Sequence, residues 1–271
     1  MPAFALSDGR NLGFSESGEG PPLLLIHGSP GEGRAWNRVA PLLTGRFRVL
    51  APDLPGYGAS DPLREADGGT AAMARAVGEL AASLGQPVWL AGHSYGGNVA
   101  LHVALQTASH DRIRGLALFE PVFFRALALN GGQAIRDEAF RFFAAYAARA
   151  AAGEKNAVAG MVDYWFGPQA FARLPIPVQA FLDACAPRNA RDVVSSFNEI
   201  LDRDELARFD KPFHVVHGTL GAPVAASIAK ALGAVAPAAR VIAMAGAGHG
   251  LLDTHPRDVA EVILDLTKGQ A

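Results

Sequence analysis

Short, almost uninterrupted hydrophobic runs alternate with longer segments of helical periodicity along most of the chain. The hydrophobic runs are residues 23–26, 47–53, 87–92, 115–120, 213–218 and 240–245. Strands that are buried on both faces have this composition. The segments with helical spacing are residues 71–84, 96–108, 223–235 and 256–267, each long enough to cross back over a sheet. The pattern predicts an α/β fold with a mostly parallel sheet and helices on both faces.

Two regions depart from this alternation. Residues 3–6 and 11–17 predict an antiparallel hairpin at the sheet edge. Residues 121–209 carry helical periodicity without a convincing strand, and we predict that they form a helical insertion above the carboxyl ends of the strands. Residues 1–120 and 210–271 are then the core of the fold. One helix face is expected at Phe140, Phe143, Ala144 and Ala147, and prolines 168, 175, 177 and 187 are expected to divide the rest into short pieces.

Charge and composition exclude several classes of protein. The 271 residues include 24 basic and 26 acidic side chains, a net charge of −2, so no broad cationic field attracts nucleic acid or an anionic bilayer. Half of the residues are hydrophobic and 18% are charged, which is typical of a globular protein and not of a disordered chain. Cys185 is the only cysteine, which excludes an internal disulfide and a multi-cysteine metal site.

The sequence also limits where the protein works and what it binds. It does not open on a basic segment followed by an apolar stretch, and no apolar run reaches about 18 residues. We expect a cytoplasmic protein that binds a small-molecule substrate, with no nucleic-acid or membrane partner, no cofactor and no metal. The oligomeric state stays open.

A serine nucleophile is predicted where a strand meets a helix. Gly92-His93-Ser94-Tyr95-Gly96 follows the predicted strand 87–92 and opens the next helix, which is the context that a G-x-S-x-G elbow requires. Its glycines permit a sharp turn that exposes Ser94 at the positive end of that helix. The structural alternative is a serine that caps a glycine-rich turn.

A serine hydroxyl needs a base, and His249 is the candidate among eight histidines. It lies between Gly248 and Gly250 in the loop after the last predicted strand, at the same sheet edge as Ser94. The alternative is a solvated loop histidine. We expect His27 and His93 to brace the reactive loops. His102, His110 and His255 fall on predicted helices or helix starts, and we expect them to lie at the surface.

At this point the chain resembles the α/β-hydrolase family, in its cap-bearing, esterase- and lipase-like branch. The resemblance covers nearly the whole chain through His27-Gly28-Ser29-Pro30-Gly31, Asp53-Leu54-Pro55-Gly56-Tyr57-Gly58-Ala59-Ser60, the Ser94 elbow and Gly248-His249. It implies an eight-stranded, mostly parallel sheet, a helical cap after the sixth strand, and a triad in the order serine, acid, histidine. It also implies a structural role for Asp53.

The acid departs from the commonest family pattern. Members usually carry an aspartate just after the seventh strand, but residues 219–223 here read Thr-Leu-Gly-Ala-Pro. Some relatives place the acid at the end of the sixth strand, where this chain has Glu120, and we take Glu120 as the third member of the triad. The alternatives are a Glu120 that is bonded only to backbone at the cap hinge, Asp253 as the acid, or a triad without an acid.

The oxyanion hole and the substrate wall are further expectations. Backbone N–H groups of Tyr95, after the nucleophile, and of Ser29, where the family places the second donor, would bind the oxyanion. The predicted insertion also supplies aromatic side chains, and any that point down would form an apolar wall over Ser94: Phe123, Phe124, Tyr146, Trp165, Phe166 and Phe181.

These residues favour a cofactor-independent serine hydrolase, a carboxylesterase on small to medium, fairly hydrophobic esters. Because His249 must be neutral to act as a base, activity is expected to fall below about pH 6 to 7. One alternative keeps the triad but hydrolyses carbon–carbon bonds or lactones, or acts as a haloperoxidase-like perhydrolase. Another is a non-enzymatic receptor on the same fold. Epoxide hydrolase and haloalkane dehalogenase activities are disfavoured, because those families use an aspartate nucleophile.

Overall fold

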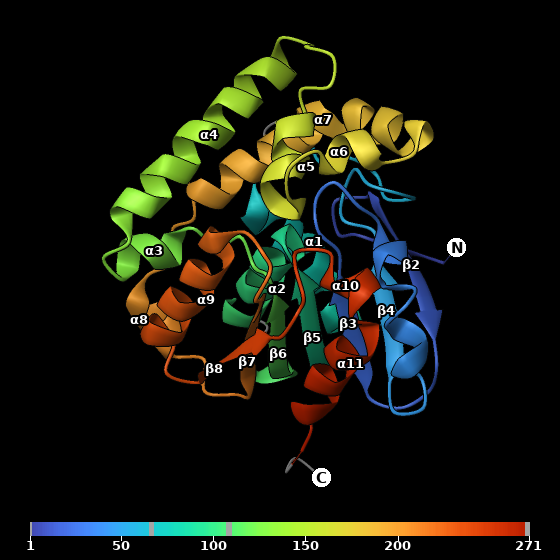
Figure 1. Ribbon diagram of the computed structural model, residues 1–271. Coiled ribbons are helices and arrows are strands. Elements are labelled where there is room, and N and C mark those ends of the chain that lie inside the picture. The colour runs from blue at the N-terminus through green and yellow to red at the C-terminus, as the bar shows by residue number, and fades with distance from the viewer. Residues whose placement is uncertain (1, 65–67, 107–109, 269–271) are drawn as a thin grey trace.

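The computed structural model describes residues 2–64, 68–106 and 110–268, and an eight-stranded sheet forms its centre (Figure 1). The strands lie in the order β1-β2-β4-β3-β5-β6-β7-β8. β1 pairs antiparallel with β2, and β2 with β4, whereas the pairs from β4 to β8 are parallel. The predicted edge hairpin and mostly parallel sheet are therefore confirmed. The strands are β1 Ala3–Ala5, β2 Asn11–Ser17, β3 Pro22–Ile26, β4 Arg48–Pro52, β5 Val88–His93, β6 Ile113–Phe119, β7 Phe213–Gly218 and β8 Ala239–Met244.

Helices cover both faces of the sheet, because successive strand side chains point to opposite sides. Leu24 and Ile26 of β3 belong to a core with α1, α2 and α9, while Leu23 and Leu25 belong to a second core with α10, α11, η1 and η2. None of the described helices is long and apolar enough to cross a membrane. Residues 107 and 108, the end of the predicted helix 96–108, lie outside the described part. The helices are α1 Thr70–Ser83, α2 Tyr95–Leu105, α9 Pro223–Val235, α10 Leu251–Thr254 and α11 Pro256–Asp265, with 3-10 turns η1 Gly33–Trp36, η2 Ala40–Leu42 and η4 His110–Arg112.

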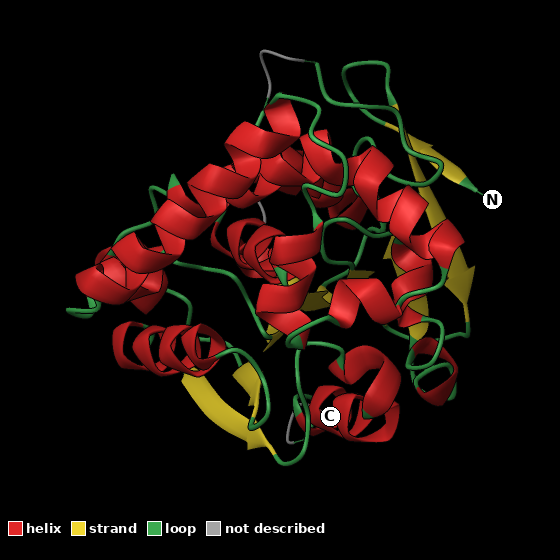
Figure 2. Ribbon diagram, turned by 45° about the horizontal axis from the view of Figure 1, so that its top comes forward, coloured by secondary structure: helices red, strands yellow, loops and turns green. Residues whose placement is uncertain are grey.

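Six helices lie between β6 and β7, within residues 121–209, which we call the cap segment. Figures 1 and 2 show α4 and α7 crossing above the sheet, with α5 and α6 beside them. On the predicted α4 face, Phe143 is fully buried, whereas Phe140 is 40% exposed. The helices are α3 Arg125–Leu129, α4 Gln133–Ala151, α5 Ala159–Phe166, α6 Ala170–Arg173, α7 Ile176–Phe197 and α8 Arg203–Ala207.

The prolines do not divide the end of the cap segment as predicted, because α7 runs through two of them. Pro177 lies in the first turn, where a backbone N–H has no helical partner. Pro187 lies inside the helix and removes one helical hydrogen bond. α7 packs along α4, where the Tyr146 hydroxyl donates to Asn189 Oδ1 at 2.7 Å. This tertiary packing outweighs the local cost of Pro187, which the sequence pattern could not show.

The sheet order brings two loops together. β3 lies between β4 and β5, so the connections reverse direction between β3 and β5. Parallel α/β sheets bind ligands outside the carboxyl ends of the strands at such a reversal. Gly28 follows β3 and Ser94 follows β5 at this point. The topology therefore positions the loop after β3 beside the predicted elbow.

Candidate active site

Ser94 lies in a sharp turn between β5 and α2, as the sequence predicts. Its backbone has φ 53° and ψ −125°, a conformation that residues with side chains rarely adopt. A Cβ on Gly92 would lie 2.2 Å from the carbonyl oxygen of Gly96, and a Cβ on Gly96 would lie 2.3 Å from that of His27. The turn therefore requires glycine at both positions, and it carries the Ser94 hydroxyl on a strained backbone at the amino end of α2.

Three side chains from separate loops form a series of hydrogen bonds. His249 Nε2 lies 3.1 Å from Ser94 Oγ, and His249 Nδ1 lies 3.0 Å from Glu120 Oε2. Ser94 is 7% exposed, His249 is 4% exposed and Glu120 is fully buried. A carboxylate can only accept, so Nδ1 carries the proton and Nε2 presents its lone pair to Ser94. The structure thus brings together the three residues that the sequence nominated for a triad.

Glu120 follows β6 directly and is fixed by a second hydrogen bond. Its φ is 49°, and its Oε1 accepts the N–H of Gly218 at 2.7 Å. A Cβ on Gly221, in the loop after β7, would lie only 2.9 Å from Oε1. The Glu120 carboxylate therefore fills the space next to the loop in which relatives usually carry their aspartate. Asp253, the alternative acid, is exposed on α10, while both ring nitrogens of His249 are engaged elsewhere.

Aromatic rings enclose His249. Trp165 stacks on its imidazole with ring centres 4.6 Å apart and planes 24° apart, and Phe166 meets it edge-on at 5.3 Å. His93 lies on another side, and its Nε2 donates to the carbonyl oxygen of His249 at 2.9 Å. These contacts fix the ring and shield it from water, which strengthens its electrostatic contact with Glu120.

The two bracing histidines are neutral. Burial lowers the pKa of His93 to about 3 and that of His27 to about 4. His27 Nδ1 donates to the carbonyl oxygen of Gly28 at 2.7 Å, and its Nε2 accepts the N–H of Leu54 at 2.8 Å. Both rings therefore connect loops around Ser94, in agreement with the expectation for them.

The two residues expected to supply oxyanion donors lie on either side of Ser94. Tyr95 is the first residue of α2, and Ser29 follows β3. A Cβ on Gly28 would lie 3.0 Å from Ser94 Cβ, so the backbone before Ser29 is in contact with the serine. A side chain at residue 28 would crowd Ser94, so glycine at this position allows the close approach of the loop to the elbow.

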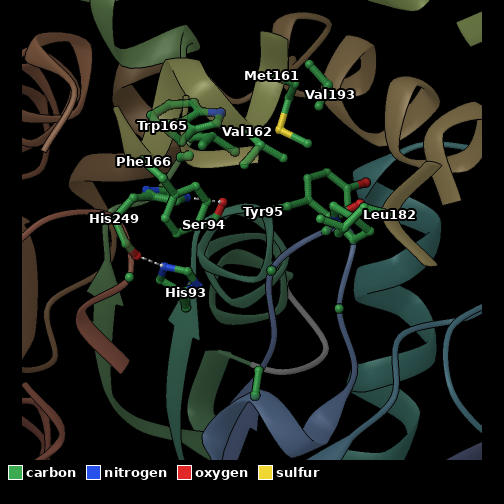
Figure 3. A pocket seen from close by; sticks show the side chains of 18 of the residues that line it. His93, Ser94, Tyr95, Met161, Val162, Trp165, Phe166, Leu182, Val193 and His249 are labelled. Atoms are coloured by element: carbon green, nitrogen blue, oxygen red, sulfur yellow. Dashed lines mark hydrogen bonds between the residues drawn. The ribbon is translucent and has the colours of Figure 1, made fainter. Parts of the chain in front are cut away.

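A cavity of about 470 Å³ lies over Ser94, between the core and the cap segment (Figure 3). Figure 3 shows Trp165 and Phe166 beside His249, with Met161 and Val162 above Ser94. Of the six aromatic residues expected as a wall, Phe124, Trp165 and Phe166 line the cavity, and Phe143 joins them. The other apolar residues that line the cavity include Val122, Leu174, Val178, Leu182, Val193 and Leu252. The cavity is thus suited to a hydrophobic small molecule.

Sequence analysis missed a buried polar group from the cap segment. Asp192 of α7 accepts hydrogen bonds from the hydroxyls of Ser29 and Tyr57, both at 2.6 Å. Burial raises the pKa of Asp192 to about 6, although these two hydrogen bonds oppose the increase. Asn189 lies one turn earlier on the same helix and donates to Ser29 Oγ at 3.0 Å. Their spacing of three places both residues on one face of a helix, but it does not show whether that face is buried.

The expected surface position of His102 is wrong. This residue of α2 is 7% exposed and its Nε2 pairs closely with Glu199 Oε2. Glu199 also accepts from Thr70 Oγ1 at 2.9 Å and from Asn98 Nδ2 at 3.2 Å. Because Glu199 reaches α2 from the end of the cap segment, the sequence around His102 gives no sign of its partner. His255 is half-buried, and the side chain of His110 lies outside the described residues.

Asp53 is hydrogen-bonded to the backbone of two neighbouring loops. Asp53 accepts the N–H groups of Gly33 at 2.7 Å and Ala59 at 2.9 Å, in agreement with the structural role implied for it. Across the part of the chain that the structure describes, no group of three or more histidine, cysteine, aspartate or glutamate side chains is arranged to hold a metal ion.

Comparison with known proteins identifies the family of this chain and supports its fold. The sequence profile of the alpha/beta hydrolase family matches residues 23–262. The structure of an esterase from Exiguobacterium antarcticum is similar, with a TM-score of 0.78 at 19% identity. The alignment covers 98% of this chain and 99% of that one. At this identity the likeness shows the fold.

Two curated relatives are similar over part of their length. The soluble epoxide hydrolase of a Corynebacterium species is 40% identical over 102 residues, which are 37% of this chain and 35% of that protein. The 30 kDa magnesium-chelatase subunit of Rhodobacter capsulatus is 36% identical over 121 residues, 41% of this chain and 43% of that protein. The chain thus aligns with less than half of each relative. The profile match nonetheless spans most of the chain, and the protein belongs to the alpha/beta hydrolase family.

Proposed function

We propose that this hydrolase is a cofactor-independent carboxylesterase that acts on small to medium, fairly hydrophobic esters. The observation that carries the proposal is the hydrogen-bonded series Ser94–His249–Glu120, of which Ser94 and His249 line an apolar cavity. A neutral imidazole with its Nε2 lone pair toward a serine hydroxyl is the arrangement that activates serine as a nucleophile.

In the first half of the reaction, Ser94 Oγ attacks the ester carbonyl while His249 takes the hydroxyl proton. Glu120 holds the proton on Nδ1 and stabilises the imidazolium that forms. The carbonyl oxygen becomes an oxyanion, for which the N–H groups of Ser29 and Tyr95 are the proposed donors. His249 then returns its proton to the leaving alcohol, and the acyl group stays on Ser94.

In the second half, a water molecule gives its proton to His249 and attacks the acyl-enzyme. The carboxylic acid leaves and Ser94 regains its proton. This step favours an acyl substrate: the attack of serine on an epoxide or a haloalkane would leave an ether, which a water activated by histidine does not hydrolyse. The name of the epoxide hydrolase relative therefore does not transfer to a chain with Ser94 as the nucleophile.

The cavity supports the proposed substrate class. Its volume of about 470 Å³ falls in the range of about 300–1,000 Å³ that is typical of small-molecule sites. Phe124, Phe143, Met161 and Trp165 offer it apolar surface, so affinity comes from burial of hydrocarbon. Negatively charged acyl groups would lose hydration without a cationic partner, since the described lining of the cavity contains no lysine or arginine.

Steady-state hydrolysis of p-nitrophenyl esters with acyl chains of increasing length tests the proposal. We expect saturable turnover that is lost in Ser94→Ala and in His249→Ala, and a preference for chains longer than acetate. Faster hydrolysis of a lactone or a vinylogous diketone than of every ester would replace the esterase with the carbon–carbon or lactone hydrolase. Folded protein that hydrolyses none of them would overturn the enzymatic assignment and favour a receptor.

A further inference from the structure

Two successive turns of the cap helix α7 contact the two residues that flank Ser94. Ser29 Oγ donates to Asp192 Oδ2 at 2.6 Å and accepts from Asn189 Nδ2 at 3.0 Å. Tyr57, from the loop after β4, donates to the same Oδ2 at 2.6 Å. The hydroxyl of Ser29 is therefore held from the cap segment on two sides, and its orientation depends on the seat of α7.

The next turn of α7 reaches the second flanking residue. Ser195 Oγ donates to the backbone carbonyl oxygen of Asp192 at 2.7 Å and lies 3.0 Å from the hydroxyl of Tyr95. Asp192 thus contacts Ser29 through its side chain and Tyr95 through Ser195. Ser29 and Tyr95 are therefore fixed in relation to one segment of α7, residues 189–195, whose side chains make none of the described hydrogen bonds to Ser94 or His249.

We propose that Asp192 is a positioning residue, which in its ionised form holds the loop of Ser29 so that its N–H, together with that of Tyr95, faces the oxyanion. This inference rests on the esterase mechanism above. A misplaced donor weakens transition-state binding more than substrate binding, because the full negative charge exists only in the transition state. Asp192 therefore affects kcat more than KM.

The ionisation state of Asp192 matters because two hydroxyl groups, those of Ser29 and Tyr57, donate to its carboxylate. The ionised carboxylate accepts a hydrogen bond from each hydroxyl, and such charge-assisted hydrogen bonds are about twice as strong as neutral ones. A protonated carboxyl group carries a donor of its own and accepts less strongly, so the hold on Ser29 weakens. Since burial raises the pKa of Asp192 to about 6, this change falls in a pH range in which ester hydrolysis can be measured.

The other titratable groups around Asp192 keep one charge state between about pH 5 and 8. Burial and the neighbouring Asp192 raise the pKa values of Tyr57, Tyr95 and Tyr146 above the ordinary tyrosine value, so all three stay neutral. Arg188 and Arg191 of α7 stay cationic in this range. The pKa of His27, beside Tyr57, is lowered to about 4 by burial, so its ring also stays neutral. Asp192 is the group in this set that titrates.

The test compares the pH dependence of kcat in the wild-type protein and in Asp192→Asn, with one p-nitrophenyl ester. We expect the variant to lower kcat about tenfold or more at about pH 8 with KM changed less than about twofold, a smaller loss than removal of a whole donor. The ratio of the two kcat values should fall toward one with a midpoint near pH 6. Any pH dependence that the two proteins share cancels in this ratio.

Glu199→Gln is the matched control, because Glu199 is also a buried cap-segment carboxylate that accepts from core side chains but does not contact Ser29. Its kcat ratio to the wild-type protein should not change with pH. Ser29→Ala removes the held hydroxyl and keeps the N–H, so it should reproduce the pH-dependent loss. The double variant with Asp192→Asn should lose no more than either single variant.

The outcomes separate the two proposals. A wild-type protein without ester hydrolysis overturns the esterase mechanism. An active wild-type protein with a pH-independent ratio in Asp192→Asn, or with a neutral Ser29→Ala, overturns the positioning role alone. If Asp192→Asn does not fold, Ser29→Ala decides by the same ratio, because its small change in volume leaves the core intact.

Discussion

Replacement of Glu120 by glutamine tests the acid that this chain places at the end of β6. The glutamate holds two donors, the N–H of Gly218 on Oε1 at 2.7 Å and Nδ1–H of His249 on Oε2 at 3.0 Å. A glutamine has one oxygen and can accept from only one of them. If that oxygen stays on Gly218, the amide NH₂ faces Nδ1, and His249 must then take the tautomer with its proton on Nε2, toward Ser94.

The size of the expected loss in kcat follows from the competition of Gly218 and His249 for the single amide oxygen. Catalysis requires the amide oxygen of the glutamine to face Nδ1–H of His249, so that the amide NH₂ faces the N–H of Gly218. The N–H of Gly218 is then a buried donor without an acceptor, which costs about 1–3 kcal/mol. Loss of the negative charge weakens the hydrogen bond to the imidazolium by about 1.5–3 kcal/mol in the transition state. Together they raise the barrier by about 2.5–6 kcal/mol, so kcat should fall by about 10²–10⁴. KM should change little, because Glu120 does not line the cavity.

The assay is steady-state hydrolysis of a p-nitrophenyl ester at saturating substrate, with circular dichroism to confirm folding. Asp253→Asn is the matched control, since Asp253 lines the cavity on α10 but does not share a ring nitrogen of His249. It should keep kcat within about twofold of the wild type, as expected for a surface substitution of about 0.5 kcal/mol or less. A folded Glu120→Gln with kcat within about threefold of the wild type, or a large loss in Asp253→Asn, would refute the assignment.

Three further predictions concern neighbouring groups. Because a Cβ on Gly221 would lie 2.9 Å from Glu120 Oε1, the double variant Glu120→Ala/Gly221→Asp should recover at least about tenfold in kcat over Glu120→Ala, as measured with the same ester; no recovery would mean that the two positions are not equivalent. The raised pKa of Asp192, about 6, means that the native state binds a proton more readily than the unfolded chain, so stability from this group is greatest at low pH and is lost as the pH rises through about 6. Asp192→Asn should therefore gain up to about 3 kcal/mol relative to the wild type between about pH 4 and 7 in urea unfolding, and a pH-independent difference would contradict this. Trp165→Ala should lower the free energy of unfolding by about 3–5 kcal/mol and shift the acyl preference toward bulkier esters, since Trp165 is buried against His249 and lines the cavity; an unchanged ester profile would exclude it as a wall of the acyl site.

The residues of the series were predictable because each follows a strand. Strand runs mark where the carboxyl edge of the sheet lies, so Ser94, Glu120 and His249 could be assigned to one edge without coordinates. Glycines at 92 and 96 marked the elbow because only glycine fits where a Cβ would meet backbone at 2.2–2.3 Å. Local chemistry and strand order together determine this part of the site.

The contribution of the cap segment was not predictable in the same way. Asp192 and Glu199 are polar residues in a helical region, and nothing in their local sequence distinguishes a buried carboxylate from a solvated one. Their partners Ser29 and His102 lie far away along the chain. The path of α7 through Pro187 likewise depends on packing against α4. Long-range contacts between the cap segment and the core decide these features, and periodicity does not encode them.

Mass spectrometry after incubation with a fluorophosphonate tests the central claim most directly, because this reagent forms a stable adduct only with an activated serine. The account predicts one adduct per chain, mapped to Ser94, absent in His249→Ala and formed more slowly in Glu120→Gln. Folded wild-type protein that stays unlabelled, or an adduct that maps to another serine, would contradict it.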